Sequence, residues 1–160
     1  MPIHPEVQIG HVHLTVGDLD RSLAFYRDLL GFEVTARYGT SAVFLSAGGY
    51  HHHIGLNTWA GKGATPPPQG HTGIYHHAIL FPTRKELAQI LKRLMEANYP
   101  LTGTADHGVS EAIYLNDPDG IGVELYVDRP RHTWKVKNDG MVEMTTEPLD
   151  LANLLAESDK

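Results

Sequence analysis

The chain has 160 residues, 41% of them hydrophobic, which suits one ordinary globular domain. Thirteen Lys and Arg against nineteen Asp and Glu give a net charge of −6, which argues against a nucleic-acid-binding surface. The absence of cysteine excludes disulfide frameworks, thiolate metal sites and cysteine nucleophiles. The sequence has neither a signal-peptide pattern nor a membrane-spanning apolar run, so we expect no membrane partner and a cytoplasmic location.

The first half predicts a strand, a helix and three more strands. Residues 9–16 alternate and contain β-branched side chains, which favours a strand. Asp18 is a suitable N-cap and Gly31 a suitable helix stop. The apolar helical spacing between them comprises Leu19, Leu23, Tyr26 and Leu30. Short strands are expected at 32–38, 41–46 and 52–58.

The second half predicts the same succession of elements. Residues 74–81 form a strand pattern, and Thr83 with Glu86 forms a capping box. The apolar face of the helix that follows comprises Leu87, Ile90, Leu91 and Leu94. Strands are expected near 99–103, at 111–116 and, after an Asp-Pro-Asp-Gly turn, at 121–127.

The two halves repeat one βαβββ unit. Ile9 precedes Ile74 by 65 residues, and Ala42 precedes Ala112 by 70. This predicts an α+β fold with two modules, about 9–60 and 74–128, in a single domain of residues 1–132. Residues 61–73 form a linker or a lid over a site.

A C-terminal tail of residues 133–160 follows, with a possible short helix at 148–156 that begins near Thr146 or Glu147. Its leucines would dock on a partner or cover the chain's own sheet; they are Leu149, Leu151, Leu154 and Leu155.

The chain contains eleven histidines, and the repeat distinguishes two of them. His11 and His76 occupy equivalent positions in the first strand of each module, whereas His13 and His77 have no histidine counterpart. Glu124 is a carboxylate within an apolar strand, where an unpaired charge would be costly. The three residues would be metal ligands, or alternatively core or surface histidines and a solvated glutamate.

Two imidazoles and one carboxylate form the facial triad of non-haem Fe(II) sites, which leaves coordination positions open. Zinc accepts the same donors, so the ligand types leave the metal undetermined.

Three segments carry a family resemblance: HVHLTVGDLDRSLAFYRDLLGFEV (11–34), YHHAILFP (75–82) and AIYLNDPDGIGVELY (112–126). They resemble the vicinal oxygen chelate superfamily, which includes glyoxalase I, fosfomycin and bleomycin resistance proteins and type I extradiol dioxygenases. The resemblance implies a curved mixed sheet around a metal site, with His11, His76 and Glu124 as ligands. It is closest to catechol 2,3-dioxygenase-like proteins.

Glyoxalase I-like members add a fourth ligand, a glutamate, at the position that corresponds here to Ile54 or Gly55. Neither side chain can bind a metal, which argues against glyoxalase activity and leaves a three-ligand site.

The resemblance to extradiol dioxygenases extends to candidate catalytic residues. The run Tyr50–Trp59 resembles the strand with an acid–base histidine, and His52, or else His53, takes that position. On a strand His51 and His53 would face one way and His52 the other. Residues 106–110 resemble a segment with a second active-site histidine, His107. Tyr114, ten residues before Glu124, matches the family's tyrosine.

The resemblance therefore implies an Fe(2+)-dependent extradiol ring-cleaving dioxygenase that acts on a catechol-like aromatic with O2. The alternatives are another metal-dependent enzyme of the superfamily, an isomerase, lyase or thiol transferase with Zn(2+), Mn(2+) or Ni(2+), and a non-catalytic small-molecule binder. Family analogy favours a homodimer, and the site could close within one chain or across the dimer.

Overall fold

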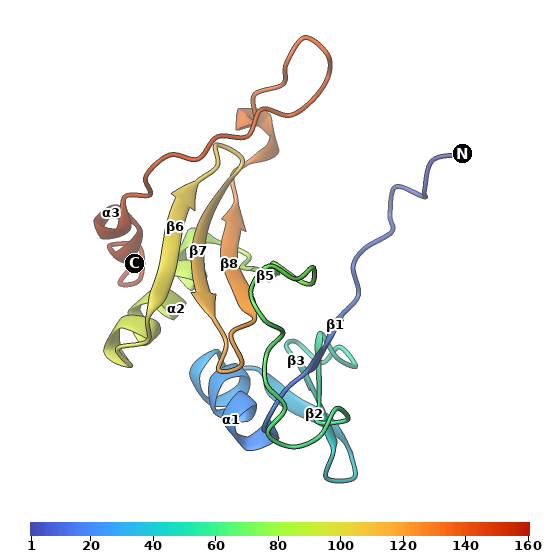
Figure 1. Ribbon diagram of the computed structural model, residues 1–160. Coiled ribbons are helices and arrows are strands. Elements are labelled where there is room, and N and C mark those ends of the chain that lie inside the picture. The colour runs from blue at the N-terminus through green and yellow to red at the C-terminus, as the bar shows by residue number, and fades with distance from the viewer. The chain divides into compact units, whose positions relative to one another are not determined.

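Figure 1 shows the computed structural model, which describes residues 1–160. The chain divides into two compact units, Met1–Pro67 and Pro68–Lys160. Each unit contains one four-stranded mixed sheet with a helical segment between its first and second strands. The predicted α+β class and the repeated βαβββ unit are therefore confirmed.

The first unit has the strand order β1-β4-β3-β2, with β1 parallel to β4 and the other pairs antiparallel. Its strands are β1 (Val12–Thr15), β2 (Glu33–Tyr38), β3 (Ala42–Ser46) and β4 (Ile54–Asn57). The helix α1 (Leu19–Leu23) continues into the π-helical segment η1 (Ala24–Leu29). Asp18 caps α1 by accepting hydrogen bonds from two backbone N–H groups, and Gly31 ends the helical segment with φ 91°.

The second unit repeats this topology in the order β5-β8-β7-β6. Its elements are β5 (His76–Leu80), α2 (Arg84–Glu96), β6 (Leu101–Asp106), β7 (Ser110–Asn116), β8 (Gly122–Asp128), η2 (Arg131–Thr133) and α3 (Leu151–Leu155). Thr83 caps α2 by accepting from Lys85 N–H, and its hydroxyl bonds the Glu86 carboxylate.

Two predicted strands are shorter in the structure. β1 begins at Val12, so His11 precedes it, and β4 begins at Ile54. The histidines at 51–53 therefore lie in the loop before β4. β4 begins at Ile54, although the His53 N–H already donates to the Leu45 carbonyl at 2.8 Å and the His53 carbonyl accepts from Val12 N–H at 3.0 Å. The strand alternation predicted for His51 and His52 does not hold, because their Nδ1 atoms lie 2.8 Å apart.

Each sheet buries one face. In the first unit that face carries Leu14, Leu45, Ile54 and Leu56, each at most 2% exposed. In the second unit α2 covers the sheet, with Leu87, Leu91 and Leu94 fully buried. The opposite faces retain half-exposed polar and aromatic side chains, among which the candidate site residues lie.

The C-terminal helix α3 packs on α2 of its own unit, as the red segment of Figure 1 shows. Its cap is Asp150, not Thr146 or Glu147. Leu154 is fully buried, and Arg84 Nη1 lies 3.3 Å from a Glu157 carboxylate oxygen. α3 therefore packs on α2 of its own chain, whereas the sequence left open a partner or the chain's own sheet. None of the chain's helices is long and apolar enough to cross a lipid bilayer.

Candidate active site

Glu124 lies at the centre of a polar cluster on the half-exposed face of the second sheet. In β8 it stands between Ala78 of β5 and Tyr114 of β7. His76 Nε2 lies 2.9 Å from Glu124 Oε2, and the Tyr114 hydroxyl lies 3.1 Å from Glu124 Oε1. Each carboxylate oxygen thus has a polar neighbour, which offsets the desolvation of a side chain only 13% exposed.

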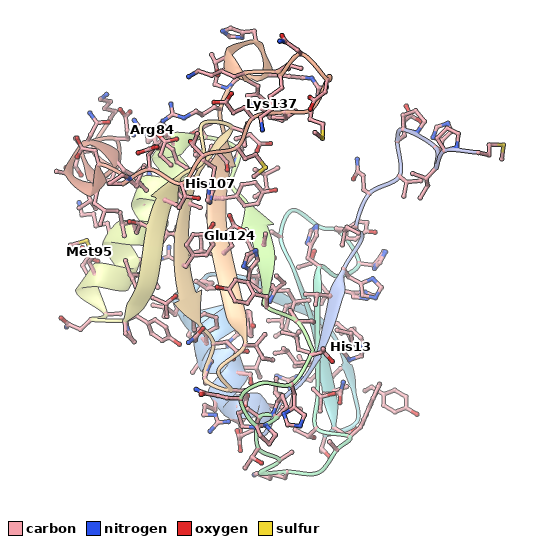
Figure 2. All side chains as sticks on the ribbon, turned by 45° about the horizontal axis from the view of Figure 1, so that its top comes forward. His13, Arg84, Met95, His107, Glu124 and Lys137 are labelled. Carbon is pink, nitrogen blue, oxygen red and sulfur yellow. The ribbon has the colours of Figure 1, made fainter.

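His107 extends this cluster from the turn between β6 and β7. Its Nε2 lies 2.7 Å from the Tyr114 hydroxyl, and its Nδ1 lies 2.7 Å from the Thr145 carbonyl oxygen. Figure 2 shows His107 and Glu124 over the strands of the second sheet. The structure therefore brings together four of the predicted site residues: His76, His107, Tyr114 and Glu124.

The phenol of Tyr114 is held in its protonated form. Burial, and then the negative charge of Glu124, raises the pKa of Tyr114 to about 12. At neutral pH its hydroxyl therefore has a hydrogen to donate.

Gly122 allows β5 and β8 to approach each other beside His76. A Cβ at this position would lie 2.1 Å from the Tyr75 carbonyl oxygen and 3.0 Å from His76 Cβ. This role was not predicted from the sequence, although a glycine at the start of a strand can signal a close approach of another backbone.

A second group of site candidates lies in the first unit. The His11 and His52 rings are 4.4 Å apart between centroids, and His52 also contacts Phe44 at 5.0 Å. Burial, followed by the charge of His11, lowers the pKa of His52.

The neighbours of His52 are oriented differently. His51 Nδ1 lies 2.8 Å from His52 Nδ1, and His53 Nδ1 lies 3.0 Å from the Ser46 hydroxyl. Of the two sequence candidates for the acid–base role, His52 is the one whose ring contacts His11.

The strand register identifies the first-unit counterpart of Glu124. Gly55 stands between His13 and Phe44, as Glu124 stands between Ala78 and Tyr114. A Cβ on Gly55 would lie 2.8 Å from His13 Cδ2, so the imidazole of His13 occupies the space that a side chain would need. The first unit thus offers no carboxylate here.

The predicted ligands are divided between the units. His76 and Glu124 lie together in the second unit, and His11 belongs to the first. Within either unit, no group of three or more His, Asp or Glu side chains could hold a metal ion.

Comparison with known proteins places this geometry in a family. Residues 8–125 match the Glyoxalase/Bleomycin resistance protein/Dioxygenase superfamily. A catechol-2,3-dioxygenase of Bacillus subtilis (strain 168) is 43% identical over 156 residues, which cover 98% of this chain and 54% of the relative. Biphenyl-2,3-diol 1,2-dioxygenase 3 of Rhodococcus globerulus is 30% identical over 76% of this chain and 63% of the relative.

This chain therefore spans about half to two thirds of the length of these curated relatives. A crystal structure of a glyoxalase/dioxygenase from Nostoc punctiforme has a TM-score of 0.66 at 18% identity, over 81% of this chain and 97% of that chain. That likeness shows the fold. Together, the family match and the 43% identical relative show that the chain belongs to the glyoxalase/bleomycin resistance protein/dioxygenase superfamily.

Proposed function

We propose that the chain is an Fe(II)-dependent extradiol ring-cleaving dioxygenase that acts on a catechol-like aromatic with O2. The observation that carries the proposal is the hydrogen-bonded series His107–Tyr114–Glu124–His76, which joins a candidate metal-ligand pair to two groups that handle protons. The 43% identity to a catechol-2,3-dioxygenase supports this reaction over others of the superfamily.

The donor set of the second unit suits a divalent metal. His76 Nε2 and Glu124 Oε2 converge to 2.9 Å, an imidazole and a carboxylate that can share one ion. With His11 of the first unit, they would complete the two-histidine, one-carboxylate set. Bound Fe(II) would supply redox chemistry and open positions for the two catechol oxygens and O2. Zinc would offer open positions but no redox chemistry.

The chain's own groups would bind the substrate and move its protons. Tyr114 stays protonated and would donate a hydrogen bond to a substrate oxygen. His52, which contacts His11, would accept a catechol proton, and His53 is the second candidate for that role. His107 Nε2, 2.7 Å from the Tyr114 hydroxyl, would exchange a proton with it.

The overall reaction balances without an external reductant. Both atoms of O2 enter the product, and the bond between one hydroxyl-bearing ring carbon and its unsubstituted neighbour breaks. The product from catechol itself would be a ring-opened muconic semialdehyde, which is yellow.

The test uses protein prepared anaerobically and loaded with Fe(II), then mixed with O2 and a panel of catechols. We expect a yellow product and uptake of O2 in equal amount to the catechol consumed. Absence of product with every catechol would overturn the proposal. Isomerase, lyase or thiol-transferase activity with Zn(II), Mn(II) or Ni(II) in place of Fe(II) would favour one of those enzyme classes. A metal-free protein that binds a small molecule without converting it would favour a binding role.

Tyr114→Phe tests the residue-level part of this mechanism. We expect kcat to fall by roughly 10- to 100-fold with iron content unchanged, because only the phenolic hydroxyl is lost. Tyr38→Phe is the matched control, since Tyr38 lies in β2 with 69% of its surface exposed.

Association of two chains is part of the proposal. The curated relatives are longer than this chain, and a second copy would supply further modules. We expect a homodimer by light scattering after gel filtration; a monomer with full activity would show that one chain closes the site alone. A cytoplasmic location remains a prediction that cell fractionation would test.

A further inference from the structure

We infer that the C-terminal segment Thr145–Glu147 is a positioning element of the candidate site, which fixes the hydrogen of His107 on Nδ1 and so leaves Nε2 to exchange a proton with Tyr114. This inference concerns the arrangement of His107 in the folded chain. Its significance for catalysis rests on the proposed function.

The segment forms an additional partial strand at the edge of the second sheet. β6 is the last strand in the order β5-β8-β7-β6, so one side of it is open to another strand. Asp106 N–H donates to the Glu147 carbonyl at 2.9 Å, and Glu147 N–H donates back to the Asp106 carbonyl at 2.9 Å. Thr145 N–H donates to the His107 carbonyl at 3.0 Å. Figure 1 shows this part of the chain passing beside β6 to α3.

The backbone of His107 is fixed independently of its ring. His107 N–H donates to the Ser110 carbonyl at 2.9 Å, and Gly108 N–H donates to Asp106 Oδ1 at 2.8 Å. Gly108 has φ 74°, a left-handed conformation that favours glycine. The turn thus fixes the backbone position of His107, and the two hydrogen-bond contacts of the ring fix the orientation of the imidazole.

The Thr145 contact determines which ring nitrogen carries hydrogen. A carbonyl oxygen only accepts, so His107 Nδ1, at 2.7 Å from the Thr145 oxygen, must be the donor. A neutral His107 then presents an unprotonated Nε2 to the Tyr114 hydroxyl, 2.7 Å away. Free imidazole side chains in water favour the opposite tautomer, with hydrogen on Nε2, so the segment imposes the less common form.

This arrangement prepares His107 to take up one proton at Nε2. The Tyr114 hydroxyl has one hydrogen and two neighbouring acceptors, His107 Nε2 at 2.7 Å and Glu124 Oε1 at 3.1 Å. When Nε2 gains a proton, Nε2–H donates to the Tyr114 oxygen and Tyr114 donates to Glu124, so both bonds form together. A substrate hydroxyl that loses its proton by way of Tyr114 would leave its electron pair on the substrate oxygen and one positive charge on His107.

The tautomer is measured directly by long-range proton–nitrogen NMR of the full chain with labelled histidine. Zn(II) replaces Fe(II) so that the sample is diamagnetic, and His107→Gln assigns the signal. We expect His107 to show a protonated Nδ1 and an unprotonated Nε2 at mildly alkaline pH. A signal with hydrogen on Nε2 alone would overturn the inference.

A proline substitution tests whether the segment is the cause. Thr145→Pro removes the N–H that bonds the His107 carbonyl, and we expect the tautomer to shift toward Nε2–H. Thr146→Pro is the matched control, because Thr146 N–H makes no hydrogen bond in the structure, and the tautomer should stay unchanged. If Thr145→Pro does not fold, Glu147→Pro replaces it, since it removes the next bonding N–H along the segment. An unchanged tautomer in the folded variant would refute the positioning role.

Kinetics separate this inference from the proposed function. With an active enzyme, Thr145→Pro should lower kcat for ring cleavage by roughly tenfold or more, with KM and iron content within about twofold of the parent. A correct tautomer in a protein that cleaves no catechol would reject the proposed function alone. Ring cleavage with the Nε2–H tautomer would reject this inference alone.

Discussion

The inner strands β4 and β8 occupy equivalent places in their two sheets, yet they carry different residues on the face opposite the apolar core. Where β8 places Glu124 next to Tyr114, β4 places Gly55 next to Phe44. The first unit has the imidazole of His13 in the space that a side chain on Gly55 would need. One backbone arrangement thus supports an aromatic, histidine-lined face in one unit and a carboxylate–phenol pair in the other.

The difference is possible because register is set by the buried faces. In both units the inner strand points apolar side chains into the core from one face: Ile54 and Leu56 in β4, Val123 and Leu125 in β8. A shift by one residue would expose them, so the ladder is fixed whatever the other face carries. The open face is consequently free to vary, and the proposed ligands and proton-handling groups lie there.

The buried polar residues of the two sheets also differ, and substitution of Glu111 is expected to have the largest effect on stability. This carboxylate is 3% exposed and bonds Arg84 Nε at 2.8 Å and Arg129 Nη2 at 2.9 Å, whereas Ser46 and Asn57 are the buried polar residues of the first sheet. Glu111→Ala should lower the free energy of unfolding by about 2–4 kcal/mol, because Arg84 and Arg129 both lose their most buried carboxylate partner and keep only the more exposed Glu157 and Asp106. Urea denaturation measures the free energy of unfolding. The control is Glu33→Ala at an exposed position, which should stay within about 0.5 kcal/mol of the parent.

Gly55→Ala tests the claim that His13 occupies the space of the missing side chain. We expect destabilisation of about 1–3 kcal/mol in urea denaturation, because the new Cβ would meet the imidazole at 2.8 Å. In a His13→Ala background the same change should cost less than about 1 kcal/mol. Equal costs in the two backgrounds would show that the His13 ring is not the obstacle.

Thr83→Ala compares how the two helical segments begin. Thr83 accepts a hydrogen bond from Lys85 N–H at 3.1 Å, as Asp18 does from Asp20 N–H at 2.9 Å in the first unit. Loss of the cap should lower the thermal unfolding midpoint of the protein by an amount that corresponds to about 1 kcal/mol. Thr72→Ala, in the exposed stretch before β5, should leave the unfolding midpoint unchanged.

Acid stability should depend modestly on Asp106 of the second unit. The hydrogen bond from Arg129, more than any other contact, lowers the pKa of Asp106 in the folded protein. Its contribution is therefore present above the unfolded-state pKa near 4 and is lost as pH falls through the lower folded-state pKa. Asp106→Asn should make the unfolding free energy less sensitive to pH in this acid range, while Glu33→Gln should not. If the unfolding free energy of Asp106→Asn fell with decreasing pH as steeply as that of the parent, the result would contradict this account.

Local patterns in the sequence were sufficient to predict most of the elements and the repeat. Caps and apolar spacing located both helices, with Asp18 and Thr83 as N-caps, because these signals act over one or two turns. The pairing of Ala42 with Ala112 agrees with the strand registers, in which they oppose Asn57 and Tyr126 respectively. Among the candidate site residues, the proximity of His76, Tyr114 and Glu124 follows from strand alternation in adjacent strands.

Contacts that depend on irregular backbone could not be predicted in this way. The contact between the His51 and His52 rings occurs in a loop, where strand alternation does not apply. The Thr145 contact with His107 uses a main-chain carbonyl, which every residue possesses and no motif identifies. The packing of α3 on α2 depends on tertiary fit, because its leucines would suit any apolar surface.

The most direct test of the proposed site is anaerobic metal analysis of freshly purified protein, together with His11→Ala, His76→Ala and Glu124→Ala. The account predicts about one iron per parent chain and a large loss of metal in each of the three variants. His132→Ala, an exposed histidine outside the site, should retain the parent content. Full metal content in all three ligand variants would contradict the central claim.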